Sequence, residues 1–253
     1  ARAGNATTTD SVNLLSAVTK GYGDTSAAAM QKASDLAFLT VKLGQTSFPE
    51  LASSMGQVIP LASTLKVSQE ELFGAMSTLT GVTGGTAEVT TQLKATMQSF
   101  LSPSSQMEKA IKGMGYASGA AALESEGLGG ILTKLMESVD GDTVAFANLF
   151  SSVEAKNAVL ALAGSQAQNF ADKTDAMREA AGAADAAFDT QTASVSAMAA
   201  KLKNAGSVML TSLGEKALPY IQTALDGVIG KLPEMTQAME GMIEKSGPVF
   251  EKL

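Results

Sequence analysis

Helical patterns that are interrupted at short intervals set the strongest limit on how this chain folds. Apolar side chains recur every three or four residues along most of the sequence, which is the spacing of one helix face. Gly44 and Gly81 are among the residues that end these patterns after a few turns, and Pro60 predicts a break before LASTL. Residues 1–185 therefore cannot form one long rod, and many short helices are expected.

The composition favours helices over strands. Ala, Leu, Met, Gln, Lys and Glu are common, and all have high helix propensity. Val and Ile are sparse, and no stretch alternates apolar and polar residues for long, so strands have little support. The predicted fold class is all-α. It comprises a compact domain of short helices, residues 1–185, followed by longer amphipathic helices with a heptad pattern, residues 186–253.

Capping residues and apolar spacing define the individual helices. Ser47, Pro49 and Glu50 open one helix, because proline is tolerated in a first turn. Ser105 and Glu108 have capping-box spacing, in which each side chain bonds to the other residue's backbone N–H. Other helices are expected at residues 10–20, 26–43, 68–81, 89–101, 105–114, 128–139, 143–152, 154–163 and 165–181.

Residues 67–81, VSQEELFGAMSTLTG, carry the most complete helix signals in the chain. Ser68 is an N-cap residue, and the Glu71 carboxylate is expected to reach back to the Ser68 backbone N–H. Apolar residues then follow on one face. Glu70 and Glu71 are adjacent and point about 100° apart on a helix, so they cannot share a proton or a metal ion. The segment is interpreted as scaffold and not as an active site.

Other candidate motifs also favour structural roles. The sequence has no His and no Cys, which excludes imidazole and thiol catalysis and leaves only carboxylates for a zinc site. Residues 140–142, DGD, lack calcium-loop spacing and predict a turn with an N-cap. The glycines within residues 113–119 miss dinucleotide-binding spacing and predict a helix end and hinge. GLGG at residues 127–130 lacks the Lys-Thr of a phosphate loop. We expect no catalytic residue, no cofactor, no metal ligand and no enzymatic activity.

Charge and hydropathy exclude two further classes of partner. The net charge is −7 and no stretch clusters Lys and Arg, so direct nucleic-acid binding is not expected. The longest uncharged run, residues 72–87, is shorter than the roughly 20 apolar residues of a transmembrane helix. The sequence starts without Met and stops without a terminating pattern, which suggests a piece of a longer chain.

The last quarter of the sequence has apolar residues in a heptad register, the spacing of helices that wind around each other. Pro233 interrupts the register, since proline removes one helical hydrogen bond. Three interpretations are open: two amphipathic helices that cap the same bundle, a self-associating seam, and a membrane-active hairpin, which is the least favoured. The candidate oligomerisation seam consists of Leu218, Ile221, Leu225, Val228, Leu232, Met235, Met239 and Met242.

Several segments follow one another in a distinctive order. They are SDLAFLTV (34–41), FPELASSMGQVIPLA (48–62), VSQEELFGAMSTLTG (67–81), LKATMQSFLSPS (93–104) and KAIKGMG (109–115). Looser matches continue through AKNAVLALAG (155–164), REAAGAADAAF (178–188) and LKNAGSVMLTSLGEKALPYI (202–221). No single motif is diagnostic, but the order and spacing are specific. Together they resemble the core region of bacteriophage tail tape measure proteins, the phage-related minor tail protein family.

The resemblance implies a structural and mechanical role. Tape measure proteins occupy the lumen of the tail tube, set tail length during assembly and leave ahead of the DNA on infection. The implied partners are the tail tube protein, tail assembly chaperones and tail-tip or baseplate proteins. A homo-oligomer is expected, as a trimer or alternatively a hexamer. The implied locations are the virion, in the tail lumen or at the tail tip, and the host cytoplasm during assembly.

A protein that measures length must be extended. As one helix, a 253-residue chain would reach about 380 Å at ~1.5 Å per residue. The interrupted helices of residues 1–185 instead predict a folded domain of a longer ruler. In this chain, the heptad region is the part able to begin a lumenal coiled coil.

Two other classes of function are open. A secreted helical effector or pore-forming protein is favoured by the richness in Ala and Gly and by the absence of Cys, and it predicts membrane binding. An enzyme is the second class, because long tape measure proteins often carry lytic domains elsewhere in the chain. Peptidoglycan hydrolysis needs a positioned carboxylate or a metal site, and this sequence shows no convincing one.

Overall fold

The computed structural model describes residues 7–190 and 192–193. Within these residues no strand is present, and one isolated bridge pairs Thr80 with Gly84. The predicted all-α fold of short helices is therefore confirmed for them. The chain divides into two compact units, Ala1–Gln191 and Thr192–Leu253. The predicted heptad helices lie outside the described residues.

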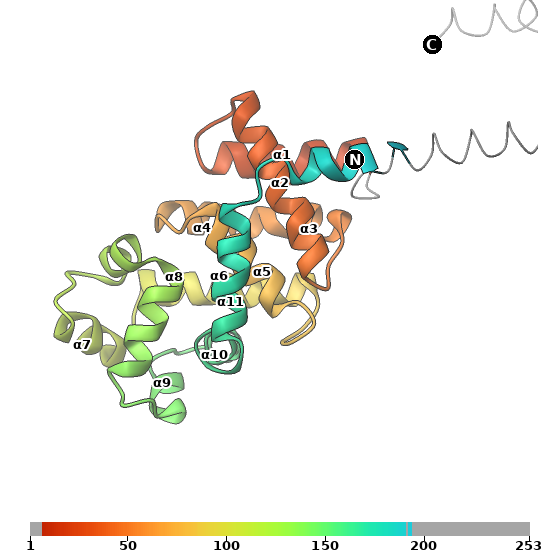
Figure 1. Ribbon diagram of the computed structural model, residues 1–253. Coiled ribbons are helices and arrows are strands. Elements are labelled where there is room, and N and C mark those ends of the chain that lie inside the picture. Colours follow the sequence, from red (N-terminus) through yellow and green to blue (C-terminus); the bar gives the residue numbers. More distant parts are fainter. Residues whose placement is uncertain (1–6, 191, 194–253) are drawn as a thin grey trace, which may run out of the picture. The chain divides into compact units, whose positions relative to one another are not determined.

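The helices of the first unit follow one another through short connections (Figure 1). They are α1 (Thr8–Gly21), α2 (Ala27–Leu43), α3 (Phe48–Ser54), the 3-10 helix η1 (Met55–Gln57), α4 (Ile59–Thr64), α5 (Gln69–Leu79), α6 (Thr86–Leu101), α7 (Ser105–Gly113), α8 (Gly119–Glu137), α9 (Thr143–Asn148), α10 (Val153–Leu160), the π-helix η2 (Ala161–Ser165) and α11 (Ala167–Arg178). Residues 183–190 are also helical.

Capping residues predicted the start of α3 correctly but misplaced the start of α7. Ser47 and Glu50 open α3 with a complete capping box. The box predicted for Ser105 and Glu108 is wrong, because α7 is capped one residue earlier. The Ser104 hydroxyl accepts the Met107 N–H (3.1 Å) and donates to the Leu149 carbonyl (2.7 Å), a distant bond that Ser105 does not make. Glu108 instead pairs with a lysine one turn further along α7.

α5 lies at the centre of the core. Every residue from Glu71 to Leu79 is buried, and α2, α6, α8 and α11 all pack against this helix. The apolar spacing predicted one buried face, whereas the structure buries the helix all round. The hydroxyls of Ser77 and Thr78 are accommodated there because both donate to the Gly74 carbonyl (2.9 and 2.8 Å). In Figure 1, α1–α3 lie toward one end of this unit and α7–α9 toward the other.

α11 packs closely on α5 where α5 has a glycine. A Cβ atom added at Gly74 would lie 2.6 Å from Thr174 Oγ1 and 3.2 Å from Thr174 Cα. At the same contact, Lys173 donates to the Ser77 carbonyl (2.7 Å), and burial lowers the pKa of the Lys173 ammonium group. The absence of a side chain at position 74 thus allows the two helices to approach.

We expect Gly74→Ala to lower the free energy of unfolding by about 1–3 kcal/mol, the usual effect of overpacking a filled core. Urea denaturation of the whole chain measures this change. Gly56→Ala is the matched control, because no atom lies within 4 Å of a Cβ added there and its unfolding free energy should hold or rise slightly. Equal losses in both variants would contradict the close contact at Gly74.

Candidate functional site

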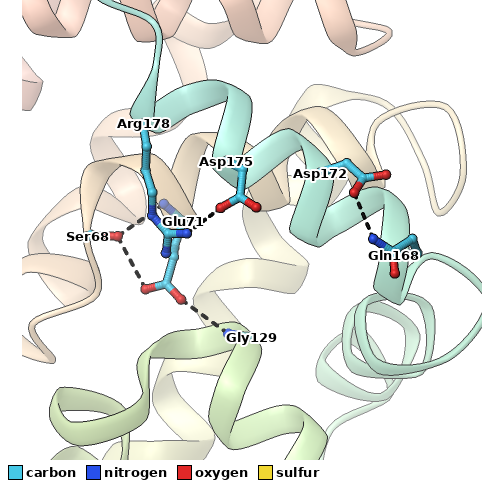
Figure 2. Close-up of polar contacts among 7 residues, drawn as sticks. All are labelled: Ser68, Glu71, Gly129, Gln168, Asp172, Asp175 and Arg178. Atoms are coloured by element: carbon cyan, nitrogen blue, oxygen red, sulfur yellow. Dashed lines mark hydrogen bonds and ion pairs between the residues drawn. The ribbon is translucent and has the colours of Figure 1, made fainter.

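Glu71 is a buried carboxylate at the start of α5, with 8% of its surface exposed. The Ser68 hydroxyl caps α5 by accepting the Glu71 N–H (3.2 Å), and it donates to Glu71 Oε2 (3.3 Å). Figure 2 shows that the other oxygen points to α8, where Oε1 accepts the Gly129 N–H (3.3 Å). The predicted bond from the Ser68 backbone N–H to Glu71 is therefore wrong. The carboxylate binds the Ser68 hydroxyl and a residue 58 positions away.

The α8 side of this contact depends on a bend. Gly127 has φ 70° and ψ 176°, a backbone conformation that favours glycine. A Cβ atom there would lie 2.5 Å from Glu71 Oε1. The second half of α8 starts after the bend, and its first N–H groups have no partner within the helix. Glu71 caps that helical segment from a distant part of the chain, where a negative charge also interacts favourably with the helix dipole.

Glu70 serves a different contact. Its carboxylate pairs with Lys32 of α2, with an N–O distance of 2.7 Å. The two adjacent acids therefore diverge as predicted, one to α2 and the other to α8. This arrangement joins helices and does not assemble a pair of carboxylates for acid–base chemistry.

α11 packs against α5, and its exposed polar residues pair along their own helix (Figure 2). Gln168 donates to Asp172 (2.7 Å), and Arg178 pairs with Asp175. Pairs at this spacing stabilise a helix by a few tenths of a kcal/mol. They add to the local stability of α11 and bring no further group to the Glu71 carboxylate.

A second polar cluster joins the loop before α8 to both halves of that helix. The Tyr116 hydroxyl donates to Glu126 Oε1, while Lys134 Nζ binds the Tyr116 hydroxyl and Glu126 Oε2, both at 2.9 Å. The Tyr116 hydrogen bond, followed by the Lys134 contact, lowers the pKa of Glu126. The Tyr116 hydroxyl, followed by the Glu126 carboxylate, raises the pKa of Lys134. A carboxylate that holds its charge in this way is poorly suited to act as a general acid near neutral pH.

The remaining motifs have structural roles in the part of the chain that the structure describes. Residues 140–142 form the predicted turn and N-cap, with Asp142 accepting the Val144 and Ala145 N–H groups at the start of α9. Gly113 ends α7, and Gly115 follows with φ 92°, as predicted for a helix end. Gly127, the first residue of GLGG at 127–130, forms the bend of α8.

The chemistry available is limited across residues 7–190 and 192–193. No group of three or more His, Cys, Asp or Glu there could hold a metal ion. Over the same residues, no helix has the length and apolar character needed to cross a membrane. The candidate seam from Leu218 to Met242 lies outside them. The described clusters hold helices together, and this is the role that their geometry supports.

Sequence reasoning missed both long-range clusters. The closely spaced glycines at 127, 129 and 130 were a signal for unusual backbone next to α5, but nothing local identifies Glu71 as their partner. Tyr116 and Lys134 carry no recognisable motif at all. The Glu71 contact depends on the packing of α5 against α8, and the second cluster depends on how the loop before α8 lies against both halves of that helix.

We expect Glu71→Ala to lower the free energy of unfolding by about 1–3 kcal/mol, since the Gly129 N–H loses its buried partner. Glu70→Ala is the matched control on the neighbouring residue. It removes an ion pair whose lysine is half exposed, and such pairs contribute less than about 1 kcal/mol. Chemical denaturation of both variants compares them directly. A loss for Glu70→Ala as large as that for Glu71→Ala would refute the special role of Glu71.

We expect Tyr116→Phe to raise the pKa of Glu126 toward its ordinary value, because the phenol is the main cause of the depression. A depressed folded-state pKa contributes stability that is present above the unfolded-state pKa and is lost as the pH falls through the folded-state pKa. In the variant the folded-state and unfolded-state pKa values of Glu126 should lie closer together. The pH range over which Glu126 affects stability should therefore be narrower.

An NMR titration of the Glu126 side-chain carboxyl carbon measures this pKa. Tyr22→Phe is the control, because the Tyr22 hydroxyl binds the Val67 carbonyl and should leave Glu126 unchanged. An unaltered Glu126 pKa in Tyr116→Phe would show that the phenol does not set it.

A family model described as phage-related minor tail protein matches residues 1–150, which is more than half of the chain. Searches of curated proteins and of solved structures gave no significant match. The match begins before α1 and ends after α9, so it includes the central helix α5 and the bend of α8. The chain therefore belongs to the phage-related minor tail protein family.

Proposed function

We propose that this chain is a folded part of a longer tape measure protein in a phage or phage-tail-like particle. The family match over residues 1–150 carries the proposal, and it gives the chain a structural role in a phage tail. The finer assignment is supported by the order of segments from SDLAFLTV to KAIKGMG, which resembles the tape-measure core. In this role the protein is not an enzyme.

The helix lengths decide which part of such a protein this would be. α8 is the longest described helix at 19 residues, or about 28 Å at ~1.5 Å per residue, and it is bent at Gly127. Helices packed around α5 cannot measure out a tail. The folded domain is instead an attached module of the ruler, and extended segments elsewhere set the length.

We propose the division 1–185 for this module and 186–253 for the heptad region. A separation of contacts between Gln191 and Thr192 supports a boundary close to this position. The seam from Leu218 to Met242 would begin a lumenal coiled coil of identical chains, a trimer or a hexamer. Its heptad spacing is the support for that assembly.

The proposed partners and course of events follow from this role. The chain assembles in the host cytoplasm with tail assembly chaperones. It then lies in the lumen of the tail tube, in contact with the tube protein and with tail-tip or baseplate proteins. On infection it leaves ahead of the DNA. No contact with nucleic acid is needed for these steps.

Quantitative mass spectrometry of purified particles tests this function. We expect peptides from residues 7–190 in intact tails and a strong loss of them, relative to tail tube peptides, after DNA release is triggered in vitro. The tube peptides provide the internal control. An unchanged ratio after release would contradict ejection, and recovery of the chain only as free protein in the culture medium would favour a secreted effector.

A further inference from the structure

Asp35 is a second buried carboxylate that binds a distant part of the chain. It lies in α2 and is 3% exposed. Its Oδ2 accepts the Gly182 N–H (2.9 Å) and its Oδ1 accepts the Ala184 N–H (2.8 Å), 147 and 149 positions away. These donors lie at the start of the helix formed by residues 183–190, whose first N–H groups have no partner within it. Asp35 therefore supplies the cap of that helix.

The helix of residues 183–190 buries little of its surface. No residue from 183 to 190 is buried, and Phe188 is 43% exposed. Ala183 and Ala187 border a hollow of about 500 Å³ that also touches Phe38 and Leu39 of α2. The chain just before it is held more firmly, because Met177 and Ala180 are buried. The change from firm to light packing falls at Gly182, where Asp35 binds.

Asp35 also has access to water if its contacts open. It borders a hollow of about 440 Å³ together with Lys32 of α2 and Gly182. Gln31 donates weakly to its Oδ1 from the same helix (3.4 Å). Once the Gly182 and Ala184 bonds break, the carboxylate is left beside an amide, a cation and solvent. This differs from Glu71, whose loss would leave the half-buried Gly129 N–H without its partner.

We propose that the Asp35 carboxylate is a latch that fastens the helix of residues 183–190 over α2. Opening the latch uncovers the apolar surface around Phe38 and Leu39 and leaves the helices packed on α5 in place. A force that pulls on the chain from its C-terminal side acts on this latch before it acts on α11. The latch is inferred from these contacts alone. A role for it in a phage tail rests on the proposed function. Hydrogen exchange tests the latch whether or not the protein has that function.

Hydrogen exchange of the whole 253-residue chain, followed by mass spectrometry, tests the latch with two variants. Asp35→Asn keeps one acceptor and sets an amide N–H group against one of the two backbone donors. Ala184→Pro removes the Ala184 N–H and leaves Asp35 intact. Proline there takes the second helical position, which Pro49 and Pro60 already take in α3 and α4.

Both variants should speed the exchange of amides in residues 185–190 by about tenfold, the effect of losing one charge-assisted hydrogen bond. Exchange in α5 should not change. Glu124→Gln is the control, because it also removes one negative charge, from an exposed residue outside this helix, and it should match the wild type.

The latch is overturned if residues 185–190 are unprotected in the wild type, or if Ala184→Pro leaves their exchange unchanged. It is also overturned if α5 loses protection to the same extent as residues 185–190 in Ala184→Pro. Should Asp35→Asn unfold the whole domain, the selective effect of Ala184→Pro still decides the question, since that variant keeps the buried carboxylate.

Discussion

The carboxylate of Glu71 joins the start of α5, the central helix of the core, to the bend of α8. A buried carboxylate is costly unless hydrogen bonds replace its water. The Ser68 hydroxyl and the Gly129 N–H supply them. Gly127 in turn permits the backbone turn and the close approach. α5 is buried on every side from Glu71 to Leu79, and α2, α6, α8 and α11 pack against it, so this contact joins α8 to the central helix of the core.

The same device recurs where the domain is held less firmly. Asp35 caps residues 183–190 at the edge of the unit as Glu71 caps the second half of α8 in the core. A chain with no His, no Cys and few aromatic residues thus uses acidic side chains to join helices across long sequence separations. Glu71 lies in the core and Asp35 lies at the edge of the unit. Breaking the hydrogen bonds of these two carboxylates should therefore have different consequences. Loss of the Glu71 contact disrupts the core, whereas opening at Asp35 releases one exposed helix.

Local signals in the sequence predicted the helices well and their connections poorly. Ser47, Ser68 and Asp142 mark helix starts because an N-cap acts within three residues. The box at Ser105 was misplaced, since a bond from Ser104 to the distant Leu149 carbonyl selects the earlier residue. The helix expected at residues 128–139 covers only the second half of α8, and the first half, from Gly119, was not predicted. Contacts over 58 or 147 residues have no local signature, and the seam from Leu218 to Met242 stays a prediction.

Membership of the minor tail protein family and a core of short capped helices agree on a structural module. We infer that Glu71 makes α5 and the second half of α8 one cooperative unit. Native-state hydrogen exchange in increasing denaturant measures whether they open together. The Gly129 amide and the α5 amides should open with the same free energy and the same denaturant dependence. Opening of Gly129 at a much lower free energy, with little dependence on denaturant, would contradict it.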